Sequence, residues 1–367
     1  LIFCNFSSYA IDTKAEQAII IDFNTKEVLF EKNSNHKVPP ASMTKIMTVY
    51  IAFDRLTNTN LTIGNKCRIS SKAYKKGGSR TFLEIDDKVS IDDLLKGIII
   101  QSGNDASIAL AECLAGTESD FAKLMNFYAK EIGMLNTRFN NSSGWPEDNH
   151  YSTVYDIAIL SNRIVRDFPN LYEYFNLKEF TYNKIKQPNR NKLLSNFNGA
   201  DGLKTGYTKK SGWGIAASAI NDNRRITVVI NGTNSSRSRL NESSYLLKWA
   251  FTQTSEKKLL LKGELIKTVD VWLGNKPTVN LIVEDDLISI LSFDQLKLIK
   301  STISYEKPIK APIKKGEKLG NLEINIAGKK TINIPLIAEK DVKETNPLFK
   351  LFAAIKYLIF GTSLDEI

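Results

Sequence analysis

The segment "PPASMTKIMTVY" (residues 39–50) combines a helix start with a serine and a lysine three positions apart. Proline suits the first turn of a helix, because its φ angle is fixed near the helical value and the first turn needs no N–H donor. Ser42 and Lys45 then share one helix face. The segment therefore predicts a helix whose N-terminus carries a hydroxyl beside an amine.

The same segment fits a second interpretation. Ser42 could be an ordinary N-cap, with Lys45 exposed on the first turn. Because the pattern S-x-x-K fixes only two positions, it does not separate these alternatives by itself. The distinction depends on whether other parts of the chain supply groups that act with a serine and a lysine.

Two further short motifs supply such groups. "SGN" (102–104) lies at a break between two apolar helical stretches, and "KTG" (204–206) lies within the β-type run "DGLKTGYT" (201–208). Taken singly, the first fits a helix C-cap and the second a strand end. Together, in this order and in a helix, a loop and a strand, the three motifs are typical of penicillin-binding proteins and class A β-lactamases.

The S-x-x-K motif has the residue types that nucleophilic catalysis needs. A serine hydroxyl is a poor nucleophile until a base takes its proton. A lysine can be that base when burial or a nearby cation lowers its pKa. We therefore predict Ser42 as the nucleophile and Lys45 as the base, with Lys204 as the nearby cation.

The other two motifs have residue types that bind a peptide. Ser102 can pass a proton between the base and a leaving amine, and Asn104 offers an amide donor and acceptor to a substrate peptide bond. Lys204 and Thr205 can bind a carboxylate. Gly206 allows a substrate backbone to lie close along the strand.

The composition limits the classes of partner. The chain has 367 residues, enough for about two domains, and 50 Lys and Arg against 40 Asp and Glu give a net charge of +10. This excess is spread along the sequence, without a basic run interleaved with aromatic residues or a zinc-finger spacing. We therefore expect no nucleic-acid partner, whereas an anionic membrane surface remains compatible with the charge.

The cysteines and histidines give no sign of a metal site. The chain has three cysteines without a C-x-x-C motif, and His36 and His150 stand apart, so we expect neither a metal nor another cofactor. A Ser–His–Asp triad has no recognisable histidine motif to build on. Cys67 and Cys113 could pair in an oxidising compartment or remain buried thiols, and the sequence leaves both open.

The hydrophobic patterns predict an α+β fold. A strand hairpin at 17–32 precedes a helical middle, and three short strands and a helix follow it, which suggests one antiparallel sheet flanked by helices within 11–255. A β-rich texture between 259 and 340 predicts a small sandwich or barrel. The expected helices cover 91–100, 105–114, 119–133, 152–165 and 239–251, and the expected strands 201–208, 212–220 and 224–232.

Both ends of the chain carry apolar segments. "LIFCNFSSYA" (1–10) fits the end of a secretory signal, with cleavage after Ala10, and an ordinary first strand is the alternative. The segment 346–361 has one apolar stripe and flanking lysines, but it is shorter than the about 20 residues that span a bilayer. It predicts an amphipathic helix lying in a membrane interface, with a helix docked on protein as the alternative.

Over nearly its whole length the chain resembles low-molecular-mass penicillin-binding proteins, the serine-type D-alanyl-D-alanine carboxypeptidases (peptidase S11-like). The resemblance is carried by the three motifs and by stretches such as "GSRTFLEIDDKVSIDDLLKGIIIQSGNDASIALAE", "NRNKLL" and "GIAASA". It implies a β-lactamase/transpeptidase-like catalytic domain with a helical subdomain, a small all-β domain and a C-terminal amphipathic anchor.

The resemblance also implies a role for individual residues. Ser42 is acylated by the penultimate D-alanine of a peptidoglycan stem peptide, with Lys45 as general base, which limits cross-linking of the cell wall. Ser102 and Asn104 form the second wall, and Lys204 and Thr205 hold the terminal carboxylate. The N–H groups of Ser42 and Tyr207 form the oxyanion hole. Arg190 and Arg239 either assist with carboxylate charge or form structural salt bridges, and His150 is structural.

The resemblance further implies β-lactam antibiotics as covalent inhibitors and a location on the periplasmic side of the cytoplasmic membrane after secretion. Three alternative functions remain. A class A β-lactamase needs an E-x-x-L-N loop, which the segment between Ser102 and Lys204 lacks. The other two are a non-catalytic wall-binding protein and an endopeptidase that cleaves cross-links with the same chemistry.

Overall fold

The computed structural model describes residues 11–327, 329, 331–347, 351 and 355. Its contacts divide the chain into two compact units, Leu1–Thr252 and Gln253–Ile367. The predicted signal remnant at 1–10 and most of the predicted tail helix at 346–361 lie outside the described residues. Within the described ranges, no helix has both the length and the apolar character needed to span a bilayer.

A five-stranded antiparallel sheet forms the centre of the first unit, in the order β2-β1-β9-β8-β7. The N-terminal hairpin therefore joins the three later strands in one sheet, as predicted, because β1 pairs with β9. Both faces of β1 are buried, as expected for a strand covered by helices on both sides. The strands are β1 (Gln17–Asp22), β2 (Val28–Lys32), β7 (Ala200–Thr208), β8 (Gly212–Asn221) and β9 (Arg224–Thr233).

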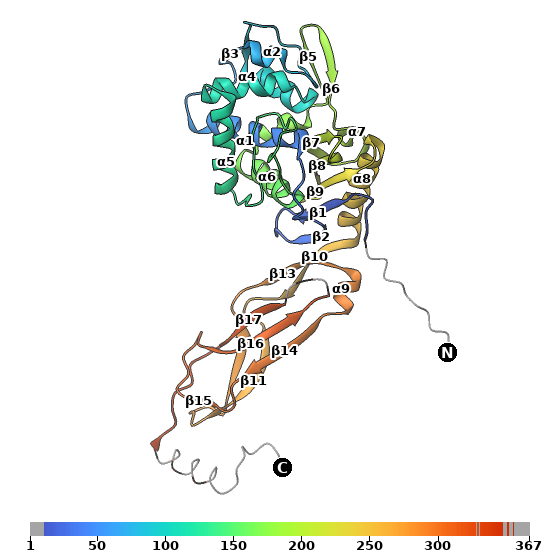
Figure 1. The fold of residues 1–367 in the computed structure, drawn as a ribbon. Coiled ribbons are helices and arrows are strands. Elements are labelled where there is room, and N and C mark those ends of the chain that lie inside the picture. The colour runs from blue at the N-terminus through green and yellow to red at the C-terminus, as the bar shows by residue number, and fades with distance from the viewer. Residues whose placement is uncertain (1–10, 328, 330, 348–350, 352–354, 356–367) are drawn as a thin grey trace, which may run out of the picture. The chain divides into compact units, whose positions relative to one another are not determined.

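Helices cover the two faces of this sheet (Figure 1). Each face of the sheet has its own apolar core, and alternate residues of β1 contribute to the two. Ile19 and Ile21 pack with the helices of one layer. Ala18 and Ile20 pack with α8 (Ser236–Gln253) on the opposite face. The first layer contains α1 (Lys45–Asn58), α3 (Ile91–Lys96), α4 (Asn104–Ala115), α5 (Glu118–Glu131) and α6 (Val154–Asp167).

Smaller elements complete this unit. The structure joins Cys67 and Cys113 in a disulfide with their Cα atoms 5.5 Å apart, so pairing is the alternative that holds. The patterns missed the hairpin formed by two short strands after α6, which have mixed exposure and little apolar alternation. The remaining elements are β3 (Lys66–Arg68), α2 (Ser71–Lys75), β4 (Lys88–Ser90), η3 (Leu171–Asn176), β5 (Glu179–Tyr182), β6 (Ile185–Pro188) and α7 (Leu193–Asn196).

The second unit is a β structure around its own apolar core. Its larger sheet has the order β14-β16-β17-β12-β11-β15, and β10 pairs with β13 in a separate ladder, which confirms the prediction of an all-β region. Its elements are β10 (Thr254–Leu260), β11 (Leu265–Trp272), β12 (Thr278–Val283), β13 (Leu287–Ser292), α9 (Phe293–Lys297), β14 (Lys300–Tyr305), β15 (Ile309–Lys310), β16 (Lys318–Asn325) and β17 (Ile332–Ala338).

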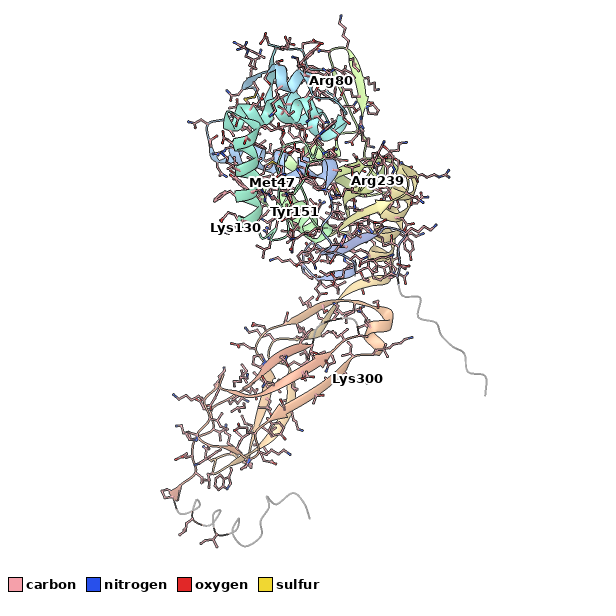
Figure 2. The ribbon with its side chains drawn as sticks, viewed as in Figure 1. Met47, Arg80, Lys130, Tyr151, Arg239 and Lys300 are labelled. Carbon is pink, nitrogen blue, oxygen red and sulfur yellow. A yellow bond between two sulfur atoms is a disulfide. The ribbon has the colours of Figure 1, made fainter. Side chains whose placement is uncertain are left out.

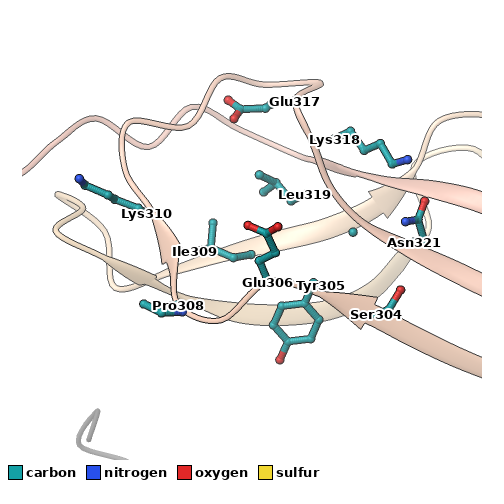
Figure 3. Close-up of a pocket in the computed structure, with 11 residues that line it drawn as sticks. Ser304, Tyr305, Glu306, Pro308, Ile309, Lys310, Glu317, Lys318, Leu319 and Asn321 are labelled. Atoms are coloured by element: carbon teal, nitrogen blue, oxygen red, sulfur yellow. The ribbon is translucent and has the colours of Figure 1, made fainter. Parts of the chain in front are cut away.

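An open groove of about 690 Å³ lies on this β unit (Figure 3). Its charged side chains are of both signs, with Glu306 and Glu317 near Lys310 and Lys318. The groove does not concentrate charge of one sign.

Candidate active site

Ser42 lies in a 3₁₀ turn, η1 (Ala41–Thr44), and not in the α-helix itself, which begins at Lys45. Three residues per turn place positions i and i+3 one above the other. The Lys45 Nζ accordingly lies 3.1 Å from the Ser42 Oγ. Ala41, just before the serine, has φ +50°, an unusual backbone conformation of the kind often found at functional sites.

Lys45 is completely buried and has two other partners. Its Nζ donates to Asn104 Oδ1 at 2.8 Å and to the Ser143 carbonyl at 2.5 Å. A neutral amine has two N–H donors and one lone pair. The three oxygen partners can each accept from the protonated amine. When the amine is neutral, its two N–H donors can stay on Asn104 and Ser143 while its lone pair faces Ser42.

The electrostatic surroundings favour that neutral form. Burial, followed by repulsion from Arg190, lowers the pKa of Lys45 to about 7. Arg190 is exposed, so solvent screens its effect and burial dominates. From the sequence we expected Lys204 to be the cation that lowers the pKa of Lys45. In the structure the repulsion between the two lysines instead lowers the pKa of Lys204, after burial, which is the larger cause.

The site gathers four basic side chains. Besides the two lysines, Arg239 has its pKa lowered to about 10 by burial and by Arg190. Within the described part of the chain, no carboxylate forms an ion pair with Lys45, Lys204, Arg190 or Arg239. Like charges so arranged are ready to accept an anion.

Arg239 is held against the sheet by an aromatic pair. Its guanidinium lies 5.4 Å from the ring centre of Trp213, and Trp213 packs on Tyr207 with ring centres 4.2 Å apart. Those two rings face each other because Tyr207 of β7 is paired with Trp213 of β8. Figure 2 labels Arg239 beside this sheet. Among the described residues, the contact of Arg239 is therefore with an aromatic ring rather than with a carboxylate.

The KTG strand packs directly on the turn that carries Ser42. Lys204 and Thr205 are buried in β7. A Cβ at Gly206 would lie 3.0 Å from the Pro40 carbonyl and 3.1 Å from the Ala41 Cβ. The missing side chain therefore faces η1, and the glycine permits close approach of β7 to Ser42, a different reason from the substrate contact expected from sequence.

Ser102 and Asn104 come from a distorted helix end. A π-helical turn, η2 (Gly97–Gln101), ends at Ser102 with φ +67°, and such turns are frequent at functional sites. Asn104 begins α4 and contacts Lys45 directly. Ser102 is buried, but among the described residues its hydroxyl is not one of the groups that Lys45 contacts.

Two buried carboxylates support the site and carry no motif signal of their own. Asp105 accepts from the backbone N–H groups of Thr81 and Phe82 at 2.8 and 3.0 Å, and so fixes the loop before β4. Glu118 accepts from the N–H and Oγ of Ser142. Asp105 directly follows the SGN motif and could have been suspected, whereas Glu118 shows its role only in three dimensions.

His150 takes no part in activating Ser42. One ring nitrogen, Nδ1, accepts from the Asn140 N–H at 3.2 Å, and the other lies 3.0 Å from Thr44 Oγ1. Burial, assisted by Lys45, lowers its pKa to about 4, so the ring is neutral near pH 7. Both ring nitrogens are occupied, which agrees with a structural role.

An open cleft of about 470 Å³ is lined in part by Ser42. Lys45, Ser102, Lys204 and Thr205 are at most 6% exposed, so their surroundings are largely dry. The cleft is lined by Ser42, Gly78, Ser79, Asn104, Ser143, Gly144, Trp145, Pro146, Tyr207, Thr208, Lys209 and Lys210.

The site geometry agrees with comparisons to known proteins. Residues 5–234 match the family model described as D-alanyl-D-alanine carboxypeptidase. The chain belongs to the D-alanyl-D-alanine carboxypeptidase family. Residues 255–344 match the C-terminal domain of penicillin-binding protein 5, in agreement with the small all-β domain that the family resemblance implied.

Relatives of this carboxypeptidase family match both units. D-alanyl-D-alanine carboxypeptidase DacC of Escherichia coli K12 is 39% identical over 335 residues, 89% of this chain and 84% of the relative. The crystal structure of DacD from Francisella tularensis covers 91% of this chain and 95% of its own, with a TM-score of 0.82 and 30% identity. The ampicillin-bound penicillin-binding protein D2 of Listeria monocytogenes covers 66% of this chain and 99% of its own, with a TM-score of 0.61 and 27% identity.

Proposed function

We propose that this protein is a penicillin-sensitive serine carboxypeptidase that removes the terminal D-alanine from peptidoglycan stem peptides. The observation that carries the proposal is the contact between Ser42 and a buried lysine whose pKa is lowered to about 7. A base with a pKa near the working pH is effective in proton transfer. Family membership supplies the substrate class.

In the first chemical step, the Ser42 Oγ attacks the carbonyl of the penultimate D-alanine while Lys45 takes the hydroxyl proton. The N–H groups of Ser42 and Tyr207 are the proposed donors to the oxyanion. The C–N bond then breaks, and the leaving D-alanine amine takes a proton from Lys45 through Ser102. For this relay the Ser102 hydroxyl must turn toward Lys45.

In the second step, water attacks the acyl-serine ester. Lys45 takes a proton from this water, the ester bond to Ser42 Oγ breaks, and Lys45 gives the proton to that oxygen, which restores the free hydroxyl and the neutral amine. The second half thus repeats the first with water in place of serine. Asn104 is the proposed holder of the substrate amide.

Recognition of the substrate end follows from the charge of the site. A terminal D-alanine carries a free carboxylate, and Lys204, Thr205 and Arg190 offer it cationic and hydroxyl donors. Binding this anion offsets the repulsion among the buried cations. A β-lactam carries a carboxylate next to a reactive amide in a comparable arrangement, and the ampicillin-bound Listeria relative supports the same attack in this chain.

Release of D-alanine from a peptide ending in D-Ala-D-Ala is the direct test. We expect release by the wild type, inhibition by penicillin, and a single penicillin adduct in the intact-protein mass. Ser42→Ala should lose D-alanine release and the penicillin adduct while keeping the circular dichroism spectrum of the wild type. An adduct on Ser42→Ala would refute the nucleophile, whereas no adduct on the wild type would favour a non-catalytic wall-binding protein.

We also propose that the protein works outside the cytoplasm, peripheral to the membrane. The disulfide between Cys67 and Cys113 supports an oxidising compartment, and the apolar stripe with lysines in 346–361 supports an interfacial anchor. Deletion of 346–367 should release the protein from vesicles containing anionic lipid. Unchanged sedimentation of the deletion variant with those vesicles would contradict the anchor.

A further inference from the structure

The partner of Lys45 that the motifs do not include is a backbone carbonyl. Lys45 Nζ donates to the Ser143 carbonyl at 2.5 Å, and this contact helps decide where the lysine lone pair points. A loop carbonyl can serve a base only if the loop is held. The residue before it, Ser142, is anchored on both sides.

One anchor of Ser142 is the catalytic helix itself. Its carbonyl accepts from Thr48 Oγ1 at 2.6 Å, and Thr48 lies on α1, one turn after the base. The other anchor is Glu118, which accepts from the Ser142 N–H at 3.2 Å and from its Oγ at 2.8 Å. All polar groups of Ser142 are therefore engaged.

Glu118 is buried, paired and ionised, as a fixed hydrogen-bond acceptor needs to be. It is 7% exposed at the start of α5, and its second oxygen accepts from Lys72 Nζ at 2.7 Å. Burial by itself would raise the pKa of Glu118, but the hydrogen bonds from Lys72 and Ser142 outweigh it and keep the pKa below its usual value. The carboxylate therefore stays ionised and accepts hydrogen bonds only.

We propose that Glu118 is a positioning residue for catalysis, which holds Ser142 and thereby aims the Ser143 carbonyl at Lys45. The inference rests on the proposed function, in which Lys45 is the base. A base displaced by about 1 Å can lose about a hundredfold in rate. The contacts lead from Glu118 of α5 to Ser142, and from the carbonyl of the next residue, Ser143, to Lys45 Nζ.

The test is the pH profile of acylation by penicillin, measured by adduct formation. Glu118→Ala removes one of the two anchors of Ser142 and leaves the one from Thr48, and we expect the plateau rate to fall about tenfold to a hundredfold. Glu118→Gln keeps an acceptor for Ser142 but loses the negative charge. Since the charge of Glu118 raises the pKa of Lys45, its loss should lower that pKa. We therefore expect a nearly normal plateau, with the rising limb of the profile moved to lower pH.

The shift of the rising limb in Glu118→Gln reports on the pKa of Lys45, because the charge of residue 118 is the only one near Lys45 that the substitution changes. Asp120→Ala, at an exposed position of the same helix, is the matched control and should change neither plateau nor limb. If Glu118→Ala fails to fold, Ser142→Ala decides, because it removes the 2.8 Å hydrogen bond from Ser142 Oγ to Glu118 and should also lower the plateau. The charged groups that face Lys45 are Arg190, Asp105, Glu118, Lys76 and Lys204.

The outcomes separate this inference from the proposed function. A wild type without any adduct would overturn the function itself. An acylating wild type beside a folded Glu118→Ala with a normal plateau, or a Glu118→Gln whose plateau falls as far as that of Glu118→Ala, would overturn the positioning role alone.

Discussion

The two units of the molecule treat buried charge in opposite ways. In the described part of the second unit, the buried polar side chains are the neutral Thr254 and Ser289. The first unit buries Lys45, Lys204 and Arg239 close to one another. Both units have apolar cores of the usual kind, so apolar packing does not account for the difference.

The contrast indicates where function lies. Burying a cation without a carboxylate partner costs stability, and a unit that only needs to fold avoids it. The groove on the second unit is larger than the cleft at Ser42, yet the charges of its side chains are balanced. The concentration of like charge, rather than cavity size, marks the reactive site.

The largest expected effect is the loss of the buried base. Lys45→Met should reduce the rate of acylation by about 10²–10⁴-fold, because general-base catalysis by a side chain is of this size. The matched control is Lys300→Met at an exposed position of the second unit, labelled in Figure 2, which should acylate at the wild-type rate. Equal rates for both variants would remove the distinction between the units.

Loss of the disulfide should come next and act on the first unit alone. Cys67 and Cys113 are 46 positions apart, and closure of a loop of that length is worth about 4 kcal/mol in the chain-entropy model. The double variant Cys67→Ser, Cys113→Ser should lose about that much free energy of unfolding in urea. A second transition assigned to the β unit should keep its midpoint.

A smaller effect is expected from the exposed cation beside the base. Only neutral Lys45 accepts a proton, so the wild-type acylation rate should fall about tenfold per pH unit below about 7 and level off above it. Arg190 lowers the pKa of Lys45, so Arg190→Gln should raise that pKa and move the limb to higher pH. Added salt should reduce the difference between the two proteins. A limb that stays in place would show that burial alone sets the pKa.

The smallest effect on activity should come from the core of the second unit. Leu281 is fully buried there, and Leu281→Ala should cost that unit about 2–5 kcal/mol. Acylation measured well below its unfolding midpoint should be unchanged. A parallel loss of acylation would mean that the two units are coupled in catalysis.

Sequence patterns predicted the strands of the central sheet better than the shorter elements around it. Strands 201–208, 212–220 and 224–232 and the hairpin at 17–32 match β7, β8, β9, β1 and β2 closely, because continuous apolar runs between turn residues leave few alternatives. The hairpin of β5 and β6 was missed, since most of its residues are exposed. The start of α1 was shifted, because a 3₁₀ turn has the same local sequence requirements as a first helical turn.

The sequence by itself determined the residue types of the site, their order and the two-part architecture, because short motifs and apolar periodicity are local properties. Only the tertiary structure decided which groups act on Lys45: Asn104 and the Ser143 carbonyl as partners, Arg190 as the leading cation, and Glu118 as the hold on the loop. Those contacts join positions far apart in the chain. Their strength depends on burial and distance, which no local pattern of residues specifies.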